Sequence, residues 1–256
     1  VGGSSNIIYN NRIGVSTTSA PMGNGSGGIF ILGVATGGNS MTVGGTTGLS
    51  PNTIAYSTGA GPAQFGNGYG VGIAHTDLGN QNLIIGNSIY CNAGEGIDLN
   101  FAGTFGGASN GIGNNSKPAP GISSSIANSI SGTGVNGQTI HVYRNTSSGS
   151  GCGCEGEVYL GSALVTGGTW TYTHSLGLSS AQALLVSATA TDVSNNTSQF
   201  VCNIPLPIEL LTFDVTKSGS NALLSWSTAM EKNNDTFLVQ KSTNGIDFTT
   251  IGEVKG

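Results

Sequence analysis

Short apolar runs separated by glycine and asparagine recur along residues 1–115, and similar phrases return in a fixed order. In one phrase isoleucine follows glycine, as in Gly28-Ile29-Phe30-Ile31-Leu32, Gly72-Ile73-Ala74-His75 and Gly96-Ile97-Asp98-Leu99. In the other, asparagine precedes the apolar residues, as in Asn52-Thr53-Ile54-Ala55-Tyr56, Asn87-Ser88-Ile89-Tyr90-Cys91-Asn92 and Asn6-Ile7-Ile8-Tyr9-Asn10. A disordered Gly/Ser linker does not repeat such phrases, so the pattern predicts stacked repeats.

The spacing of the repeats indicates which kind of stack to expect. Ile97 follows Ile73 by 24 residues, and Ile73 follows Ile29 by 44 residues, which is one turn with an insertion or two degenerate turns. A period near 24 fits one coil of a right-handed parallel β-helix, whose coils stack about 4.8 Å apart. Residues 1–115 therefore predict about three to four coils, which we expect to continue upstream of Val1.

Asparagine and glycine have a physical reason to lie between the strands. Asparagine tolerates the left-handed backbone of a sharp corner, and glycine adopts it without a Cβ penalty. In Asn87-Ser88-Ile89-Tyr90-Cys91-Asn92 the isoleucine is expected to point inward, between two asparagine corners. We also expect asparagine side chains at equivalent corners to hydrogen-bond along the stack.

After residue 115 the pattern changes to longer runs in which apolar and polar residues alternate, at 138–143, 169–173 and 183–191. Alternation at this spacing predicts an antiparallel β-sandwich over residues 116–203. A third segment, 204–256, supplies four more alternating runs. The whole chain is therefore expected to be all-β, with His141 and His174 facing outward from strands of the sandwich.

Composition excludes some classes of function. The formal charge is −5, from 12 acidic and 7 basic residues, so the basic surface that dominates nucleic-acid binding is not expected. The sequence has no run of about 20 apolar residues, so a membrane span is not expected. The printed sequence also opens within repeat text, without the pattern of a cleavable leader, which indicates a mature segment or one cut from a longer chain.

Charged residues are scarce in the first 115 positions, where the candidates for catalysis are Arg12, His75, Asp77, Glu95 and Asp98. Cleavage of a polysaccharide needs two converging carboxylates, or a base beside a charge-neutralising cation. Asp77 and Asp98 lie about one coil apart and form a weak Ca²⁺ candidate, and Asp192 is another. Solvated corner residues are the competing interpretation, so we predict no catalytic site and no cofactor apart from this weak Ca²⁺ candidate.

The four cysteines are Cys91, Cys152, Cys154 and Cys202. Cys152 and Cys154 are separated by one glycine, and an exposed reduced pair does not persist outside the cell. We therefore predict that Cys152 or Cys154 is oxidised, either with each other or with another cysteine such as Cys202. Cys91 is interpreted as a small buried apolar residue.

Two stretches carry a resemblance to known families. Residues 70–203 resemble bacterial surface proteins in which a parallel β-helix leads into an Ig-like domain; the resemblance rests on residues 87–99, Ile130-Ser131-Gly132-Thr133, Glu157-Val158-Tyr159-Leu160-Gly161 and residues 188–200. Asn195 lies where that family's last motif usually has glycine.

Residues 205–256 resemble the fibronectin-III-like module that precedes the sorting domain of proteins exported by the type IX secretion system of Bacteroidota. The matching text is Pro205-Leu206-Pro207-Ile208-Glu209-Leu210, Leu224-Ser225-Trp226-Ser227-Thr228-Ala229 and Phe237-Leu238-Val239-Gln240-Lys241-Ser242. The resemblance implies a secreted cell-surface protein and only the first half of that module. It also implies O-glycosylation at Thr236, in Asp235-Thr236-Phe237.

Taken together, these patterns predict a non-catalytic extracellular structural or adhesive protein whose partner is a surface glycan or another copy of itself. One alternative is the ancillary part of a β-helix polysaccharide lyase or glycoside hydrolase. The other is a self-assembling filament subunit. We further expect each end of the chain to be completed by more polypeptide, from the same chain or from a neighbouring copy.

Overall fold

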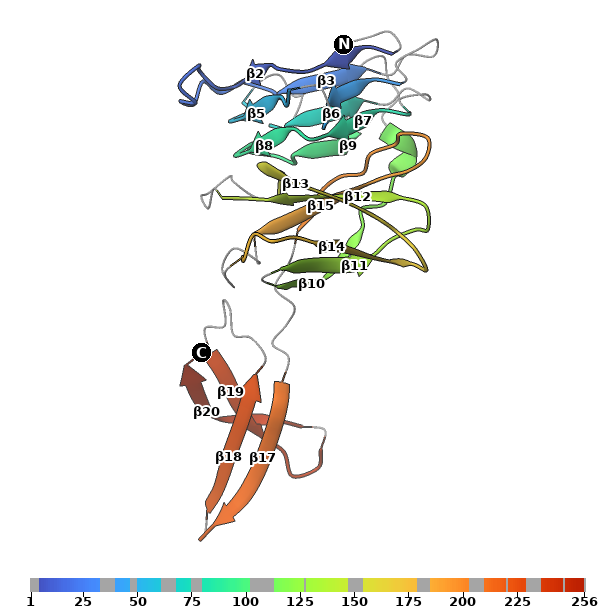
Figure 1. The fold of residues 1–256 in the computed structure, drawn as a ribbon. Coiled ribbons are helices and arrows are strands. Elements are labelled where there is room, and N and C mark those ends of the chain that lie inside the picture. The colour runs from blue at the N-terminus through green and yellow to red at the C-terminus, as the bar shows by residue number, and fades with distance from the viewer. Residues whose placement is uncertain are drawn as a thin grey trace. The chain divides into compact units, whose positions relative to one another are not determined.

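The structure is a computed structural model of residues 1–256 (Figure 1). It describes residues 5–32, 40–46, 50–60, 68–74, 80–101, 113–126, 128–146, 154–178, 185–202, 210–219, 221–228, 236–245 and 247–255. The chain divides into two compact units, Val1–Asn203 and Ile204–Gly256, which are treated separately below. The residues on both sides of the expected boundary near residue 115 belong to the first of these units.

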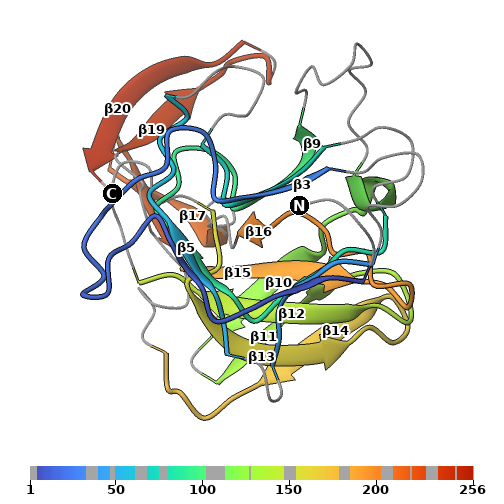
Figure 2. The same ribbon diagram turned by 90° about the horizontal axis from the view of Figure 1, so that it is seen from above.

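The first half of unit 1 consists of three parallel three-stranded sheets, and each successive group of three strands adds one strand to every sheet (Figures 1 and 2). We call each such group of three strands a coil. Coil 1 holds β1 (Ile7–Ile8), β2 (Arg12–Ile13) and β3 (Ile29–Leu32). Coil 2 holds β4 (Thr42–Gly44), β5 (Thr53–Ala55) and β6 (Val71–Ala74). Coil 3 holds β7 (Leu83–Ile85), β8 (Ser88–Tyr90) and β9 (Ile97–Phe101).

The register stacks aliphatic side chains inside the coils. Ile54 pairs with Ile89, and Ile31 pairs with Ile73. Each of these four side chains is at most 1% exposed. Burying a side chain of this size stabilises the fold by about 1.5–3 kcal/mol. The coils therefore form one continuous apolar core, as the isoleucine phrases predicted.

Two details of the expected stack were wrong. Equivalent residues of neighbouring coils lie 41 and 35 residues apart at the Asn11, Asn52 and Asn87 corner, so the length of a coil varies with the loops between strands. Only the step from Val71 to Ile97, 26 residues, comes near the expected period of 24, and the step from Ile29 to Val71 is 42 residues, one turn with an insertion. The phrase around Ile7 and Ile8 also belongs to another column, because β1 pairs with β4 and β4 pairs with β7. The partner of β5 in coil 1 is β2, which follows Asn11.

Asparagine side chains connect the coils along the stack. Asn52 donates from Nδ2 to Oδ1 of Asn87 at 2.8 Å, and its own Oδ1 accepts from Nδ2 of Asn11 at 3.0 Å. Asn52 and Asn87 are almost fully buried, at 0% and 1% exposure. The ladder satisfies corner amides that water cannot reach, so it accounts for asparagine at these positions.

The second half of unit 1 has two antiparallel sheets. One has the order β10-β11-β14, and the other has the order β13-β12-β15-β16. The strands are β10 (Gly121–Ile126), β11 (Ser129–Thr133), β12 (Thr139–Arg144), β13 (Val158–Leu164), β14 (Thr169–Thr173), β15 (Val186–Thr191) and β16 (Val201–Cys202). Ile130 and Trp170 of the first sheet share a buried core with Ile140, Val142 and Ala188 of the second.

Unit 2 contains two antiparallel hairpins. One pairs β17 (Leu210–Ser218) with β18 (Asn221–Thr228), and the other pairs β19 (Thr236–Lys241) with β20 (Thr249–Lys255). These four strands match the four runs expected from the sequence. Trp226 and Phe237 bring the hairpins together, with ring centroids 5.6 Å apart.

Candidate functional site

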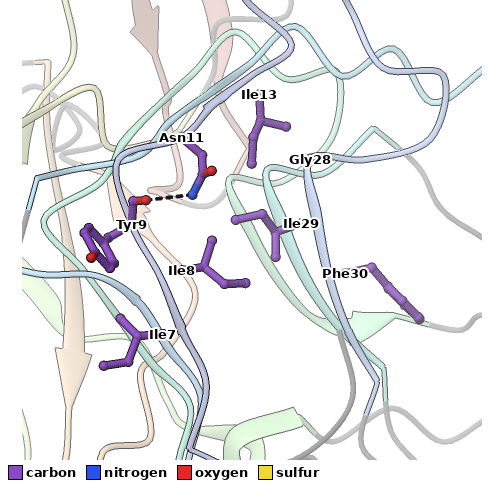
Figure 3. Close-up of a pocket in the computed structure, with 8 residues that line it drawn as sticks. All are labelled: Ile7, Ile8, Tyr9, Asn11, Ile13, Gly28, Ile29 and Phe30. Atoms are coloured by element: carbon purple, nitrogen blue, oxygen red, sulfur yellow. Dashed lines mark hydrogen bonds between the residues drawn. The ribbon is translucent and has the colours of Figure 1, made fainter.

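The first coil carries an open apolar depression of about 680 Å³ (Figure 3). We name it the first-coil hollow, and it is lined by Ile7, Ile8, Tyr9, Asn11, Ile13, Gly28, Ile29 and Phe30. These residues come from or adjoin β1, β2 and β3, each of which is an edge strand of its sheet within the described residues. The hollow therefore combines apolar side chains with strand edges.

Two aliphatic side chains of the hollow differ in exposure. Ile7 is 55% exposed, whereas Ile29 is 5% exposed and belongs to the coil core. The side-chain amide of Asn11 is already bonded, since it donates from Nδ2 to the carbonyl oxygen of Tyr9 at 2.8 Å (Figure 3). A surface of this kind suits contact with another apolar polypeptide surface better than recognition of a small polar ligand.

Two carboxylates lie close together near β9. Glu95 is exposed and Asp98 is half-buried on the strand. Partial burial, and in second place the charge of Asp98, raise the pKa of Glu95. Burial and the same carboxylate raise the pKa of Tyr69 to about 12, and Tyr69 is 2% exposed. Gln199 donates from Nε2 to Oε2 of Glu95, which ties this corner to the antiparallel half.

Asp77 and His75, the other acidic and histidine candidates for catalysis in the first 115 residues, lie outside the described residues. Arg12 lies on β2, and its guanidinium donates to the carbonyl oxygen of Ser16 at 2.9 Å and to Oγ of Ser19 at 2.6 Å. The structure thus brings together Glu95 and Asp98, and it holds Arg12 in a loop contact. Among the described residues, no group of three or more His, Cys, Asp or Glu side chains could hold a metal ion.

Asp192, the third Ca²⁺ candidate, already has partners in its own turn. Its Oδ1 accepts from the backbone N–H of Ser194 at 2.9 Å and of Asn196 at 3.0 Å, and its Oδ2 lies 3.3 Å from Nζ of Lys117. These hydrogen bonds and the Lys117 charge lower the pKa of Asp192, although burial acts in the opposite direction. Asn195 in this turn has φ 65°, the left-handed backbone that explains why glycine or asparagine is required there.

The cysteines are oxidised where the structure describes them. Cys154 and Cys202 form a disulfide with a Cα–Cα distance of 5.5 Å. Cys91 is also disulfide-bonded, so its interpretation as a free buried residue was wrong. It follows β8 directly and has φ 53°, which places it at a corner rather than in the coil core. Cys152 lies outside the described residues, and of Thr236 only its place at the start of β19 is described.

The expectation that His141 faces outward was also wrong, since the side chain is 4% exposed. β12 lies between β13 and β15, and Tyr143, two residues along the same strand, accepts a hydrogen bond from the backbone N–H of Gly86 at 3.1 Å. This face of β12 is therefore turned toward coil 3. Burial lowers the pKa of His141 to about 4, so the imidazole is neutral at physiological pH. His174 is half-buried and stacks on Tyr172.

Sequence reasoning missed the polar residues that join coil 3 to the antiparallel sheets. Asn82 donates its backbone N–H to Oδ1 of Asn114 at 3.0 Å, and Asn114 donates from Nδ2 to the carbonyl oxygen of Thr197 at 2.9 Å. The buried Glu155 accepts from Asn92 in the same way. Each contact continues a column of the coils into the sheets. The spacing of the asparagines could have indicated the columns. It could not have indicated the partners in the sheets, because Glu155 is 63 residues from Asn92 and Thr197 is 83 residues from Asn114.

Comparison with known proteins does not assign the chain to a family. No protein-family model matches it, and the curated proteins contain no match. In the parts of the chain that the structure describes, no helix has the length and apolar character needed to cross a membrane.

Proposed function

We propose that the chain is a non-catalytic extracellular structural or adhesive protein. In this proposal residues 1–115 are a right-handed parallel β-helix, residues 116–203 are an Ig-like sandwich and residues 204–256 are the first half of a fibronectin-III-like module. The three parallel sheets, the asparagine ladder and the two antiparallel sheets of unit 1 support this assignment. The four strands of unit 2 agree with the expected half-module.

The observation that carries the proposal is the first-coil hollow. Its aliphatic lining and the edges of β1, β2 and β3 suit the addition of further strands, with backbone hydrogen bonds giving affinity and the isoleucines giving an apolar contact. We propose that further polypeptide packs on this face, from more of the same chain or from a second copy, and the experiment below tests the second copy. The sheets already cover the other end of the stack, so two copies that meet through this face would meet hollow to hollow, as a pair.

Analytical ultracentrifugation over about 1–100 µM tests this proposal, because weak self-association is detected in that range. We expect a concentration-dependent dimer for the unmodified chain and a monomer for Ile7→Asp, which introduces a charge into the hollow. Ile7 is 55% exposed, so the variant should fold. Met22→Asp is the matched control, since Met22 is 65% exposed and does not line the hollow. A monomer throughout, or equal effects of the two variants, would contradict the binding of a second copy.

An extracellular location is supported by the Cys154–Cys202 disulfide, because structural disulfides persist in oxidising compartments. Export by a type IX system and O-glycosylation at Thr236 rest on the sequence resemblance. Intact mass of protein recovered from the culture medium of its native host tests both. Sugar added at residue 236 is the expected result, and an unmodified peptide covering residues 235–241 would remove the glycosylation part of the proposal.

Cleavage of a polysaccharide by this chain itself, apart from the ancillary role expected from the sequence, is a second candidate, on which the neighbouring carboxylates Glu95 and Asp98 bear. A carboxyl group with a raised pKa is suited to act as a general acid beside an ionised partner. Release of reducing ends from neutral and acidic glycans, lost in Glu95→Gln and retained in the exposed-residue control Glu253→Gln, would establish this candidate. Equal absence of release in all three proteins would reject it.

A further inference from the structure

Residues Cys154–Glu157 run along the free side of β8 and form what we name the edge strap. Ile89 donates its backbone N–H to the carbonyl oxygen of Gly156 at 2.8 Å, and Gly156 donates back to Ile89 at 3.0 Å. The pairing is antiparallel, whereas β8 pairs with β5 in parallel. The edge strap thus occupies the side of β8 where a further parallel strand would bind, and so ends this column of the coils.

Glu155 of the edge strap closes one corner of coil 3 with its side chain. Oε2 accepts from the backbone N–H of Asn92 at 3.1 Å, and Oε1 accepts from Nδ2 of Asn92 at 2.8 Å. Oδ1 of Asn92 in turn accepts from the backbone N–H of Ser57, in coil 2, at 3.1 Å. Glu155 takes the place that the next asparagine of this corner would have, because its two oxygens accept these hydrogen bonds. A protonated carboxyl group still offers its carbonyl oxygen as an acceptor.

The antiparallel half holds the edge strap in position. Cys154 is bonded to Cys202 of β16, and the hydroxyl of Ser187 in β15 donates to the carbonyl oxygen of Glu155. Gly156 passes close to two aromatic rings, since a Cβ there would lie 2.6 Å from Phe200 and 2.9 Å from Tyr143. The strap therefore belongs structurally to the sheets while its hydrogen bonds are made with coil 3.

The surroundings of Glu155 contain polar donors and a like charge. The donors to the carboxyl group are the two amides of Asn92 and the backbone at Cys91, all on the coil side. On the side of the sheets, Ser187 donates to the backbone carbonyl of Glu155 and not to the carboxyl group. The charged group that acts on Glu155 is Glu157, in the same strap. Glu155 is 2% exposed. Burial is the largest influence and raises its pKa to about 7, against the hydrogen bonds from Asn92, while Glu157 adds to the rise.

We propose that the edge strap is a pH-responsive cap, which closes coil 3 when Glu155 is protonated and loosens coil 3 when Glu155 is ionised. Ionisation puts a negative charge into a buried contact beside the acidic Glu157, so water that enters as the strap lifts relieves the cost. Protonation removes that cost. The cap thus couples the pH of the surroundings to exposure of the β8 edge, independently of the function proposed for the first-coil hollow.

Hydrogen exchange of the full chain, followed by mass spectrometry at pH 5.5 and pH 8 and corrected for intrinsic exchange, tests the cap. Peptides covering residues 88–92 report on coil 3, and peptides covering residues 129–133 report on the far sheet. From a pKa of about 7 when closed and the ordinary value of 4.5 when open, we expect opening at residues 88–92 to increase at least about 10-fold at pH 8. Residues 129–133 should respond much less.

Glu155→Gln removes the titrating group and should abolish the difference between the two pH values at residues 88–92. Glu253→Gln, at an exposed position of unit 2, is the matched control and should keep the difference. The comparison within the unmodified chain needs no variant, so it remains decisive if Glu155→Gln does not fold. Equal opening at both pH values in the unmodified chain, or the same increase at residues 129–133, would overturn the proposal.

Discussion

Asn92 donates both its backbone N–H and its side-chain amide to the two carboxylate oxygens of Glu155, at 3.1 and 2.8 Å. Asn92 ends one corner of the coils, and Glu155 precedes β13 of the antiparallel half. The contact joins two segments 63 residues apart in the chain. It is one of several contacts, with those of Asn114 and Tyr143, that hold the coils and the antiparallel sheets in one compact unit although their sequences follow different patterns.

The first prediction concerns the effect of pH on stability. The pKa of Glu155 is raised to about 7 in the folded chain, from an ordinary value of 4.5, so the folded state binds the proton more tightly than the unfolded state. The free energy of unfolding should therefore fall as pH rises from about 4.5 to about 7, by up to about 3 kcal/mol, and level off above. Urea unfolding at a series of pH values measures this change, and Glu155→Gln should flatten the profile over that window.

The second prediction concerns the asparagine ladder. Asn52→Ala removes the side chain that bonds the carbonyl oxygen of Ile8 and the backbone N–H of Asn11 in a buried corner. It also leaves Oδ1 of Asn87 with only the backbone N–H of residue 52, at 3.4 Å, in place of the 2.8 Å bond from Nδ2. We expect a loss of about 3 kcal/mol in unfolding free energy, since buried polar groups without partners are costly. Asn136→Ala removes one hydrogen bond at an exposed turn and should cost less than about 1 kcal/mol. Equal losses would contradict the role assigned to the ladder.

The third prediction compares two glycines of similar backbone conformation. Gly44 has φ 88°, and a Cβ there would lie 2.2 Å from the carbonyl oxygen of Ile85 and 2.5 Å from Oδ1 of Asn87. Gly137 has φ 83° with nothing within 4 Å of the added atom. Both alanine variants pay backbone strain of about 1 kcal/mol, and Gly44→Ala should lose about 3 kcal/mol or more because it also disturbs the ladder. Thermal unfolding of the two variants side by side measures the difference.

The fourth prediction concerns the Cys154–Cys202 disulfide, whose cysteines are 48 residues apart. A cross-link over a loop of that length stabilises a folded chain by about 4 kcal/mol in the chain-entropy description. Replacing both cysteines with serine should lower the unfolding free energy of unit 1 by about that amount. Trp170, in a Trp226→Phe background, reports unit 1 by fluorescence, and Trp226, in a Trp170→Phe background, reports unit 2 as an internal control. A larger effect on unit 2 would contradict this assignment.

The local order of residues was enough to predict the all-β class, the column that contains Ile54 with Ile89, and the asparagine hydrogen bonds between coils. It matched the phrases of β3, β6 and β9 two residues out of register, because Ile29 and Ile97 both pair with Val71 and not with Ile73. The features predicted correctly follow from short-range rules. Isoleucine between corner residues selects an inward strand position, and asparagine supplies both a left-handed corner and two hydrogen-bonding groups.

Only the tertiary structure decided the length of each coil, the column of the Ile7 phrase, the burial of His141 and the contact between Asn92 and Glu155. Loops between strands vary in length without altering the column, so a spacing read between two phrases does not define the repeat. The side of a strand that faces solvent also depends on what packs against it. β12 alternates like a half-exposed strand, but coil 3 covers its second face. Glu155, for which the sequence indicated no role, is the buried group that closes one corner of the stack.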